Sequence, residues 1–185
     1  IRDRLYSVKS EQATMLSFDT YNYLVHYFGQ PQGSMADDPN GTLGGDYEFV
    51  ISDATADRIE LKGKKYGNRI VMKAFSADQT WKQYLTRIKK VEDDAFFYEY
   101  DLRMDGLYTG QMLRSNYTFI VTYYDEVGKV HQKTVPFMFT TDGMRFHEPV
   151  TIDGQTMQNF VWKNEEISFV CTDEGATEVK LAGVY

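Results

Sequence analysis

Short runs of alternating hydrophobic and polar residues fill most of the chain, and turn-forming residues separate them roughly every eight to twelve positions. This pattern is typical of an all-β sandwich or barrel made of antiparallel strands. In the first half it predicts strands at residues 46–52, 57–65 and 68–75, and the opening residues 1–10 alternate in the same way. Gly67 and Asn68 favour a tight turn with positive φ, so the second and third of these strands should form a hairpin.

The second half of the chain continues the β pattern. Residues 94–104 predict a strand with one buried face. The residues on that face are Phe96, Tyr98, Tyr100 and Leu102. Further strands are predicted within residues 115–139, 143–163, 166–174 and 177–185. Pro136 removes one ladder donor, so its strand should lie at an edge or carry a bulge there. We expect a mainly β fold, an antiparallel meander that forms a curved sheet or partial barrel and so protects its edges.

One clear helix interrupts the predicted strands. Within residues 76–94 the apolar positions recur at helical spacing, beginning at Trp81 and ending at Val91, and Ser76 or Asp78 could cap the start. The opposite side of this helix is basic and polar, so its apolar face should pack on the sheet.

A second helical stripe begins near the N-terminus, at residues 18–28. Ser17 or Asp19 could cap it, and the spacing predicts a short helix of about ten residues with an aromatic face. Such a helix would lie between two layers or close the mouth of a barrel. The irregular run that follows, residues 29–45, is rich in Gly, Pro, Asn and Asp, and a loop of this length is usually either mobile or functional.

Length, charge and cysteine content narrow the classes of protein. A chain of 185 residues is large enough to bury a core without staples, so we expect a single β-rich domain over residues 1–185. Its 27 acidic and 20 basic residues give a formal net charge of −7, which should repel phosphate backbones, so nucleic acid is not an expected partner. Cys171 is the only cysteine, which excludes an internal disulfide and a CxxC site. No run approaches 18 apolar residues, so no membrane span is predicted.

No metal or cofactor motif is present in the sequence. His26, His131 and His147 lie far apart and form no HxxxH pattern, so they do not indicate a zinc site. The run ADDPNG brings acidic oxygens together without the register of a calcium loop, and a solvated turn is the better interpretation. We therefore expect no metal and no cofactor.

Acidic residues on the predicted strands leave hydrolysis as one alternative, because two carboxylates facing each other across a cleft could cleave a glycosidic bond. The candidates are Asp46, Glu48, Glu60, Glu99 and Asp101. No spacing distinguishes a pair among them, and a GxSxG motif is absent. No residue is therefore assigned a catalytic role, and we do not expect an enzyme.

The aromatic content is the most informative feature for function. The chain contains 14 tyrosines, whose flat apolar rings and polar tips suit both sheet faces and binding surfaces. One interpretation is ordinary cross-strand packing. The other is a ligand-binding cavity lined by rings from the first helix and from the strand near residue 98. Its predicted lining is Phe18, Tyr21, Tyr23, Tyr27, Phe28, Tyr47, Tyr98 and Tyr100.

Three stretches also resemble a known family: LSFDTYNYLVHYF, GGDYEFVI followed by IELKGKKYGN, and TTDGMRFHEPVTIDGQTMQNFVW. Together, from about Tyr6 to Trp162, the chain resembles a family of unknown function among cell-envelope lipoproteins of Bacteroidetes. The resemblance implies a lipocalin-like meander and an outer-membrane lipid anchor. It also implies that the chain is a fragment, since family members carry a lipoprotein leader and a further β-rich section before this region. Their genes commonly accompany those of glycan-importing complexes.

Three functions remain open. The first is a non-enzymatic envelope protein that binds a lipid or other hydrophobic small molecule between the sheet and the aromatic helix. The second is a glycan-binding accessory lipoprotein of a polysaccharide-uptake system, which an exposed coplanar ring pair such as Tyr123 with Trp162 would favour. The third is a scaffold or interaction module with no small ligand. The oligomeric state is left open.

Overall fold

The computed structural model describes residues 6–10, 13–18, 21–22, 25–29, 43–125 and 127–185. It divides the chain into two compact units, residues 1–78 and 79–185, and each unit has its own antiparallel sheet. The mainly β fold is therefore confirmed. A single β-rich domain over residues 1–185 stays a prediction.

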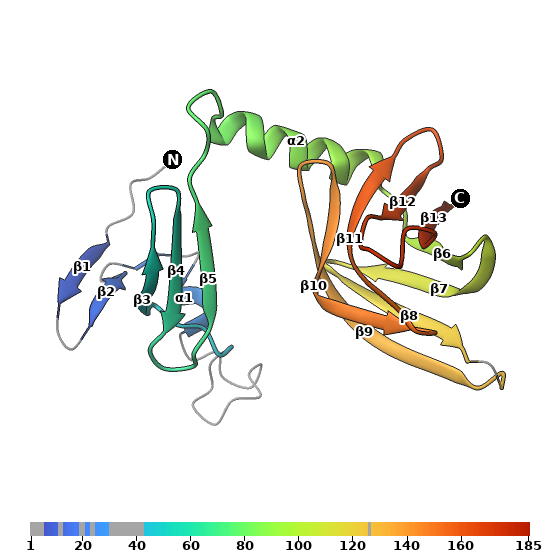
Figure 1. The fold of residues 1–185 in the computed structure, drawn as a ribbon, viewed down its shortest axis with the longest axis horizontal. Coiled ribbons are helices and arrows are strands. Elements are labelled where there is room, and N and C mark those ends of the chain that lie inside the picture. Colours follow the sequence, from blue (N-terminus) through green and yellow to red (C-terminus); the bar gives the residue numbers. More distant parts are fainter. Residues whose placement is uncertain (1–5, 11–12, 19–20, 23–24, 30–42, 126) are drawn as a thin grey trace. The chain divides into compact units, whose positions relative to one another are not determined.

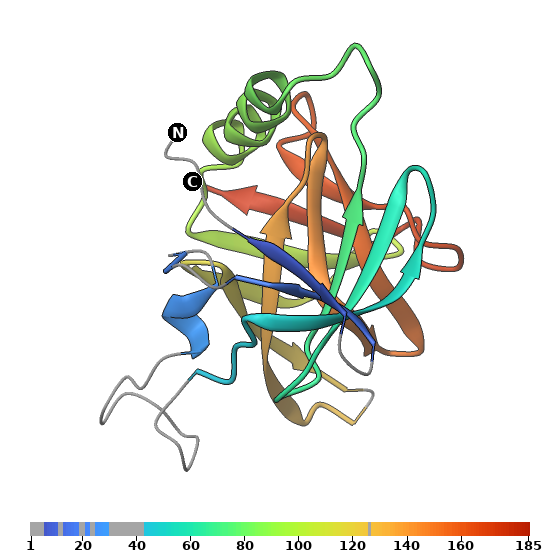
Figure 2. The same cartoon turned by 90° about the vertical axis from the view of Figure 1, so that its left-hand side faces the viewer.

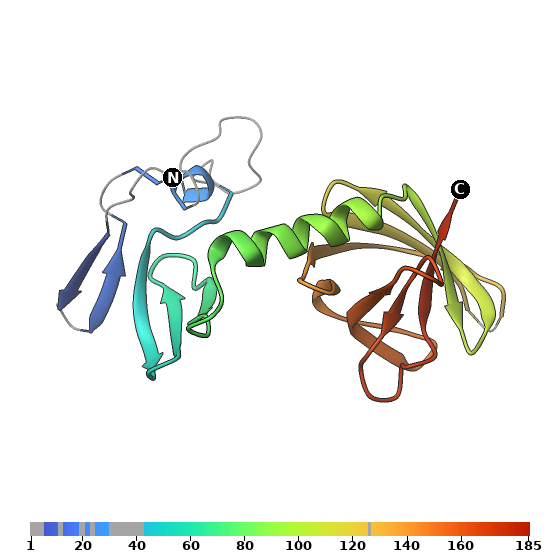
Figure 3. The same cartoon turned by 90° about the horizontal axis from the view of Figure 1, so that it is seen from above.

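The first unit contains an open five-stranded sheet in the order β1-β2-β3-β4-β5, drawn from blue to green in Figure 1 and seen from above in Figure 3. Its strands are β1 (Ser7–Ser10), β2 (Thr14–Ser17), β3 (Glu48–Ala54), β4 (Arg58–Gly63) and β5 (Arg69–Lys73). Each strand pairs with the next one along the chain. The predicted β4–β5 hairpin is confirmed, and Gly67 in its turn has a φ of +78°.

The predicted helix over residues 18–28 is confirmed only at its C-terminal end among the described residues of that segment. Strand β2 continues to Ser17, and the N–H of Phe18 donates to Tyr47 O at 3.0 Å, which extends the pairing toward β3. Only α1 (His26–Gly29) is helical. The helical spacing was misleading at its start because Phe18 packs from an extended backbone, where it meets Phe49 edge to face with ring centroids 6.2 Å apart.

The second unit is an eight-stranded barrel in the order β10-β11-β12-β13-β6-β7-β8-β9 (Figures 1 and 2). Its strands are β6 (Glu99–Met104), β7 (Leu107–Ser115), β8 (Thr118–Tyr124), β9 (Val130–Phe139), β10 (Gly143–Ile152), β11 (Gln155–Lys163), β12 (Ser168–Cys171) and β13 (Lys180–Val184). All of its strand pairs are antiparallel, and the pairing of β13 with β6 closes it. The expected meander thus closes into a barrel, and β7 is a strand that the hydrophobic pattern did not reveal.

Side chains fill the interior of the barrel. The largest of them are fully buried: Tyr100, Leu102, Met112, Phe119, Met144, Phe146, Ile152, Met157, Phe169 and Leu181. Aromatic rings meet across the interior, such as Phe119 with Phe137 at 4.4 Å between centroids. An eight-stranded barrel is just wide enough for its side chains to fill it, and this one is packed in that way. Tyr123 is buried against His131, and Trp162 packs on Phe169, so these two residues do not form an exposed pair.

The helix α2 (Trp81–Asp94) belongs to the second unit and is capped by Thr80, not by Ser76 or Asp78. The Thr80 side chain accepts from the N–H of Gln83, and the Gln83 side chain accepts from the N–H of Thr80. This reciprocal pair is a capping box, which fixes the first turn. Val91 is buried in the barrel core and Ile88 packs against it, whereas Trp81 at the other end is exposed. Within the second unit, only the last turns of the predicted apolar face pack on the sheet.

The predicted strand over residues 94–104 begins only at Glu99, and its predicted buried face is confirmed only within the strand, at Tyr100 and Leu102. Phe96 and Tyr98 are 81% and 71% exposed, while Tyr100 is fully buried. The alternation breaks because the chain leaves α2 through a turn in which the N–H of Phe97 donates to Ala95 O. Phe97, rather than its neighbours, then packs on the core.

Strand β9 shows the edge behaviour predicted for Pro136. It pairs with β10 only from Phe137 to Phe139, so the ladder between these strands ends next to the proline.

In the described residues, no helix is long and apolar enough to cross a membrane.

We predict that Tyr100→Phe destabilises the protein by about 0.5–1.5 kcal/mol, because it removes the buried hydrogen bond that the hydroxyl donates to Ala95 O at 2.7 Å, while the Phe97 N–H still donates to that carbonyl. Urea denaturation followed by tryptophan fluorescence measures the change. The matched control is Tyr98→Phe on the exposed neighbour, which should leave the midpoint unchanged. Equal midpoints for both variants would contradict the buried role of Tyr100.

Candidate functional site

A buried carboxylate organises one end of the first unit. Asp46 precedes β3, and its side chain accepts hydrogen bonds from the turn that joins β4 to β5. Its Oδ1 accepts from the N–H groups of Lys65 (2.7 Å) and Tyr66 (2.9 Å), and its Oδ2 accepts from the N–H and side-chain amide of Asn68 (3.2 and 2.8 Å). Asp46 therefore ties the turn to the start of β3, and both of its oxygens are used for this purpose.

The pKa of Asp46 lies below its usual value of 3.8. Burial alone would raise it, but the hydrogen bonds from Tyr66, Lys65 and Asn68 stabilise the charged form and together outweigh burial. Gly63 makes the arrangement possible, since a Cβ at this position would lie 1.9 Å from Asp46 Oδ2.

Three rings gather next to this turn. The ring of His26 stacks on Tyr47 with 5.1 Å between centroids and 13° between planes, and Tyr21 lies on His26 at 5.3 Å. The His26 ring is fixed because its Nδ1 accepts from the N–H of Asn22 at 3.1 Å, while Asn22 O accepts from the His26 N–H at 2.8 Å. One face of Tyr47 is thus supported by another ring, and the residue is still 44% exposed.

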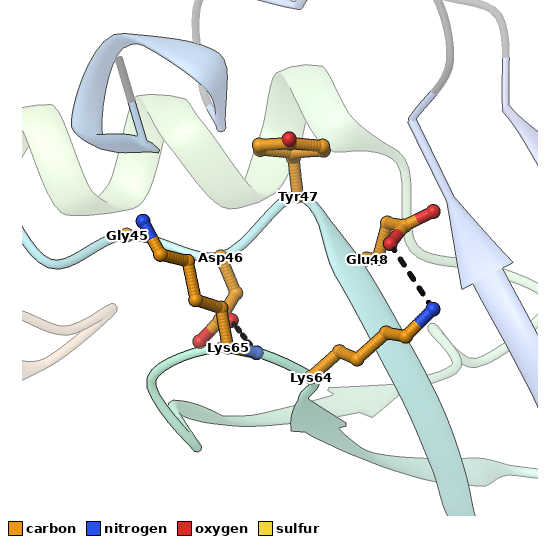
Figure 4. A pocket seen from close by; sticks show the side chains of 6 residues that line it. All are labelled: Gly45, Asp46, Tyr47, Glu48, Lys64 and Lys65. Atoms are coloured by element: carbon orange, nitrogen blue, oxygen red, sulfur yellow. Dashed lines mark hydrogen bonds and ion pairs between the residues drawn. The ribbon is translucent and has the colours of Figure 1, made fainter. Parts of the chain in front are cut away.

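A surface groove of about 320 Å³ runs beside Tyr47, and we call it the Tyr47 groove. It is lined by Gly45, Asp46, Tyr47, Glu48, Lys64 and Lys65. Figure 4 shows the Tyr47 ring edge-on at the top, with Lys65 on one side and Glu48 on the other. Glu48 pairs with Lys64 at 3.5 Å, and Lys65 donates to the Tyr66 hydroxyl at 2.7 Å. The groove therefore combines one aromatic face with charged hydrogen-bonding groups of both signs.

The structure brings only part of the predicted lining together. Tyr21 and Tyr47 join through His26, and Tyr27 meets Phe28 edge to face at 5.3 Å. Phe18 packs on Phe49 instead of facing a cavity.

The other predicted lining residues lie elsewhere. Tyr98 and Tyr100 belong to the second unit, where Tyr98 is exposed and Tyr100 is a core residue. Tyr23 lies outside the described residues, as does the ADDPNG run.

Sequence reasoning missed His26, Lys64 and Lys65 as members of this site. His26 had been considered only as a metal ligand, and two adjacent lysines in a turn are ordinary on a protein surface. The available signal was the pair of glycines at residues 44 and 45 before Asp46, since a Cβ on Gly45 would lie 2.4 Å from Phe28 Cβ. Such close backbone approach indicates that α1 packs tightly against the segment leading to Tyr47.

The remaining candidate carboxylates already have partners. Glu60 pairs with both Arg58 and Arg69, Asp101 pairs with Arg103 at 3.0 Å, and Glu99 accepts from the side chain of Gln111. Among the residues that the structure describes, no cluster of three or more His, Cys, Asp or Glu side chains could hold a metal ion. His131 instead contacts Asp125 at 2.9 Å in the β8–β9 turn.

The lowered pKa of Asp46 predicts that the anchored turn loses stability at acidic pH. Because its pKa is lowered in the folded protein, its stabilising effect is complete above the unfolded value near 3.8 and is lost as pH falls below that value. Amide exchange at Lys65 and Tyr66 should accelerate over this acidic range. Asp46→Asn should abolish this pH dependence and cost about 1.5–3 kcal/mol at neutral pH, the usual value for a hydrogen bond to a charged group. Unchanged exchange at these two amides in the variant would contradict the anchoring role.

The burial of Cys171 predicts that its thiol reacts slowly in the native protein. It is buried in the barrel, and burial raises its pKa to about 11. Because the thiolate is the reactive form, labelling by Ellman's reagent at pH 8 should be slow in the native protein and rapid in urea. Equally fast labelling in both states would show that the barrel opens readily near β12.

Comparisons with known proteins agree with the extent of the resemblance seen in the sequence. The family model described as a domain of unknown function, DUF4302, matches residues 4–164. No match was found among curated proteins or solved structures. The matched region covers most of the chain, including the whole Tyr47 groove, and the chain belongs to the DUF4302 family.

Proposed function

We propose that this protein is a non-enzymatic glycan-binding protein of the bacterial cell envelope, and that its Tyr47 groove takes a sugar residue. The observation that carries the proposal is the half-exposed Tyr47 ring, supported by His26 and bordered by charged side chains. The envelope location rests on the resemblance of the sequence to cell-envelope lipoproteins.

The ring supplies the apolar half of sugar recognition. One face of a pyranose carries mainly C–H groups and can lie flat on an aromatic ring, which buries apolar area without covering the hydroxyls. A ring held by stacking loses little freedom when it binds, so the His26 contact lowers the entropic cost of using Tyr47. The groove volume of about 320 Å³ is at the lower end for small-ligand sites and suits one or two sugar units.

The charged residues supply the polar half. Lys64 and Lys65 present ammonium donors, and Glu48 presents an acceptor, so hydroxyls of either orientation find a partner. Asp46 also lines the groove, but its oxygens already accept four hydrogen bonds from the turn. Glu48 is then the lining carboxylate that can turn toward a ligand, and this supports binding over two-carboxylate hydrolysis at this groove.

The lipid alternative gains less support from the described residues. A lipid site needs a concave and mostly apolar cavity, as in barrels that hold a small ligand. The barrel interior here is occupied by Tyr100, Phe119, Phe146 and their neighbours, and the Tyr47 groove has charged walls. Lipid binding therefore stays a prediction, and no apolar cavity among the described residues supports it.

The proposal predicts that Tyr47→Ala weakens glycan binding about tenfold or more, which corresponds to about 1.4 kcal/mol. The measurement is isothermal titration with oligosaccharides selected on a glycan array from plant and host polysaccharides. The control is Tyr98→Ala, which removes a still more exposed ring from the second unit and should leave affinity unchanged.

Two outcomes would overturn the glycan proposal. Loss of binding in Tyr98→Ala but not in Tyr47→Ala would move the site to the second unit. Thermal stabilisation by fatty acids, with no response to any oligosaccharide, would favour the lipid function instead.

A further inference from the structure

The barrel of the second unit has one incomplete ladder. Strands β9 and β10 pair only through Phe137–Phe139 and Met144–Phe146, although both strands extend well beyond these residues. We call the separated part, residues 130–136 of β9 and 147–151 of β10, the open seam.

The direction of the hydrogen bonds along β9 follows from two contacts. The N–H of Phe137 donates to Tyr117 O at 2.9 Å, so odd-numbered β9 residues bond to β8. The N–H of Thr140 donates to Gly143 O at 2.9 Å, so even-numbered residues face β10. Met138 is opposite Arg145 in the ladder. If the ladder continued toward the start of β9, the next hydrogen-bonded pair would be Pro136 with His147, followed by Thr134 with Pro149.

Both of those pairs contain a proline, which has no N–H to donate. Pro136 cannot donate to His147 O, and Pro149 cannot donate to Thr134 O. Strand β10 also shifts register against β11 between Arg145 and Val150, a bulge that bends it locally. The sequence thus prevents the two strands from pairing along the open seam.

The β9 side of the open seam is a strand edge. Gln132 and Thr134 point their N–H and C=O groups away from β8, and in the described part of the chain no strand pairs with them there. Both residues are exposed. Alternate backbone donors and acceptors along an exposed edge are the groups that an added β-strand uses.

A groove of about 530 Å³ follows the open seam and is lined by residues 133–136 and 147–151. Val135 and Val150 form an apolar floor that contacts the barrel core. Lys133 Nζ crosses the groove and donates to Thr151 O at 3.3 Å. A long side chain, rather than a backbone bond, spans the strands at this point, which indicates room for another chain between them.

We propose that the open seam binds an extended segment of a partner polypeptide, which pairs through its main chain with Gln132 and Thr134. The added strand places alternate side chains on Val135 and Val150, and one of its N–H groups replaces Lys133 at Thr151 O. Regularly spaced main-chain groups recognise this edge in register, which a sugar or an acyl chain cannot do. The open seam is separate from the Tyr47 groove and does not depend on glycan binding.

The first test is amide hydrogen exchange of the free protein by NMR. The amides of Gln132 and Thr134 should exchange at least a hundredfold faster than those of Lys133 and Val135, which bond to β8. Similar protection at all four amides would mean that the edge is already paired and would overturn the proposal.

The second test titrates a short blocked peptide of alternating threonine and valine into the labelled protein. Binding should shift and protect the Gln132 and Thr134 amides. Thr134→Pro should abolish this response, because it removes an N–H that β8 does not use, while the control Thr134→Val keeps the N–H and should bind normally.

Other outcomes would overturn the peptide proposal. Equal binding by Thr134→Pro and Thr134→Val, or no shift at these amides at millimolar peptide, would show that the edge does not accept a strand. Concentration-dependent dimerisation of the wild type, lost in Thr134→Pro, would make a second copy of this chain the occupant instead.

Discussion

The pairing of β13 with β6 is the constraint on which the second unit depends. Five consecutive residue pairs, from Lys180 with Arg103 to Val184 with Glu99, convert an eight-stranded sheet into a barrel. Without them both strands would present long unpaired edges, and the inner face that carries Tyr100 and Leu181 would meet water. The residues matched by the family model end at 164, whereas β12 and β13 follow that point, so closure depends on strands beyond the match.

Closure also decides where binding can occur. A closed eight-stranded barrel has room for its own side chains or for one small ligand, and here rings and methionines such as Phe119, Phe146 and Met157 take that space. The described side chains therefore fill the barrel interior, and the two sites proposed above lie on surfaces where regular strand pairing ends. The end of the open sheet near Asp46 and the seam beside Pro136 are two such places.

Much of the fold could be predicted from the sequence because alternation and turn residues report directly on strands. The hairpin at Gly67, the strands within residues 115–139 and 143–163, and the α2 stripe all follow from local patterns. The start of the helix predicted at residue 18 failed because Phe18 continues the pairing of β2 and packs on Phe49, a tertiary contact that ring spacing does not reveal. Closure by β13 could not be read from the sequence, since no local pattern states which distant strand will be its neighbour.

The candidate site was harder to predict than the fold for a related reason. Tyr21 and Tyr47 each contact the ring of His26, and this connection depends on a turn at Asn22 that no periodicity reveals. Tyr98 and Tyr100 were both assigned to the lining because they share one face of the predicted strand, whereas the strand begins only at Glu99, so Tyr98 is exposed and Tyr100 fills the barrel core. Aromatic composition pointed to aromatic side chains as candidates for binding, and only the tertiary structure shows which of them are buried and which are exposed.

At each of the two candidate sites regular strand pairing ends, and the backbone groups there are satisfied in different ways. At the first, the Asp46 carboxylate accepts the backbone N–H groups of Lys65, Tyr66 and Asn68, so the main chain is satisfied internally and recognition is left to side chains. At the open seam, prolines remove donors and leave the facing backbone groups of β9 without a strand, so recognition is left to the main chain. Side-chain recognition suits a ligand with distinctive functional groups, whereas main-chain recognition accepts many sequences in one conformation. The proposed sugar binding and the proposed strand addition therefore use different groups of this chain.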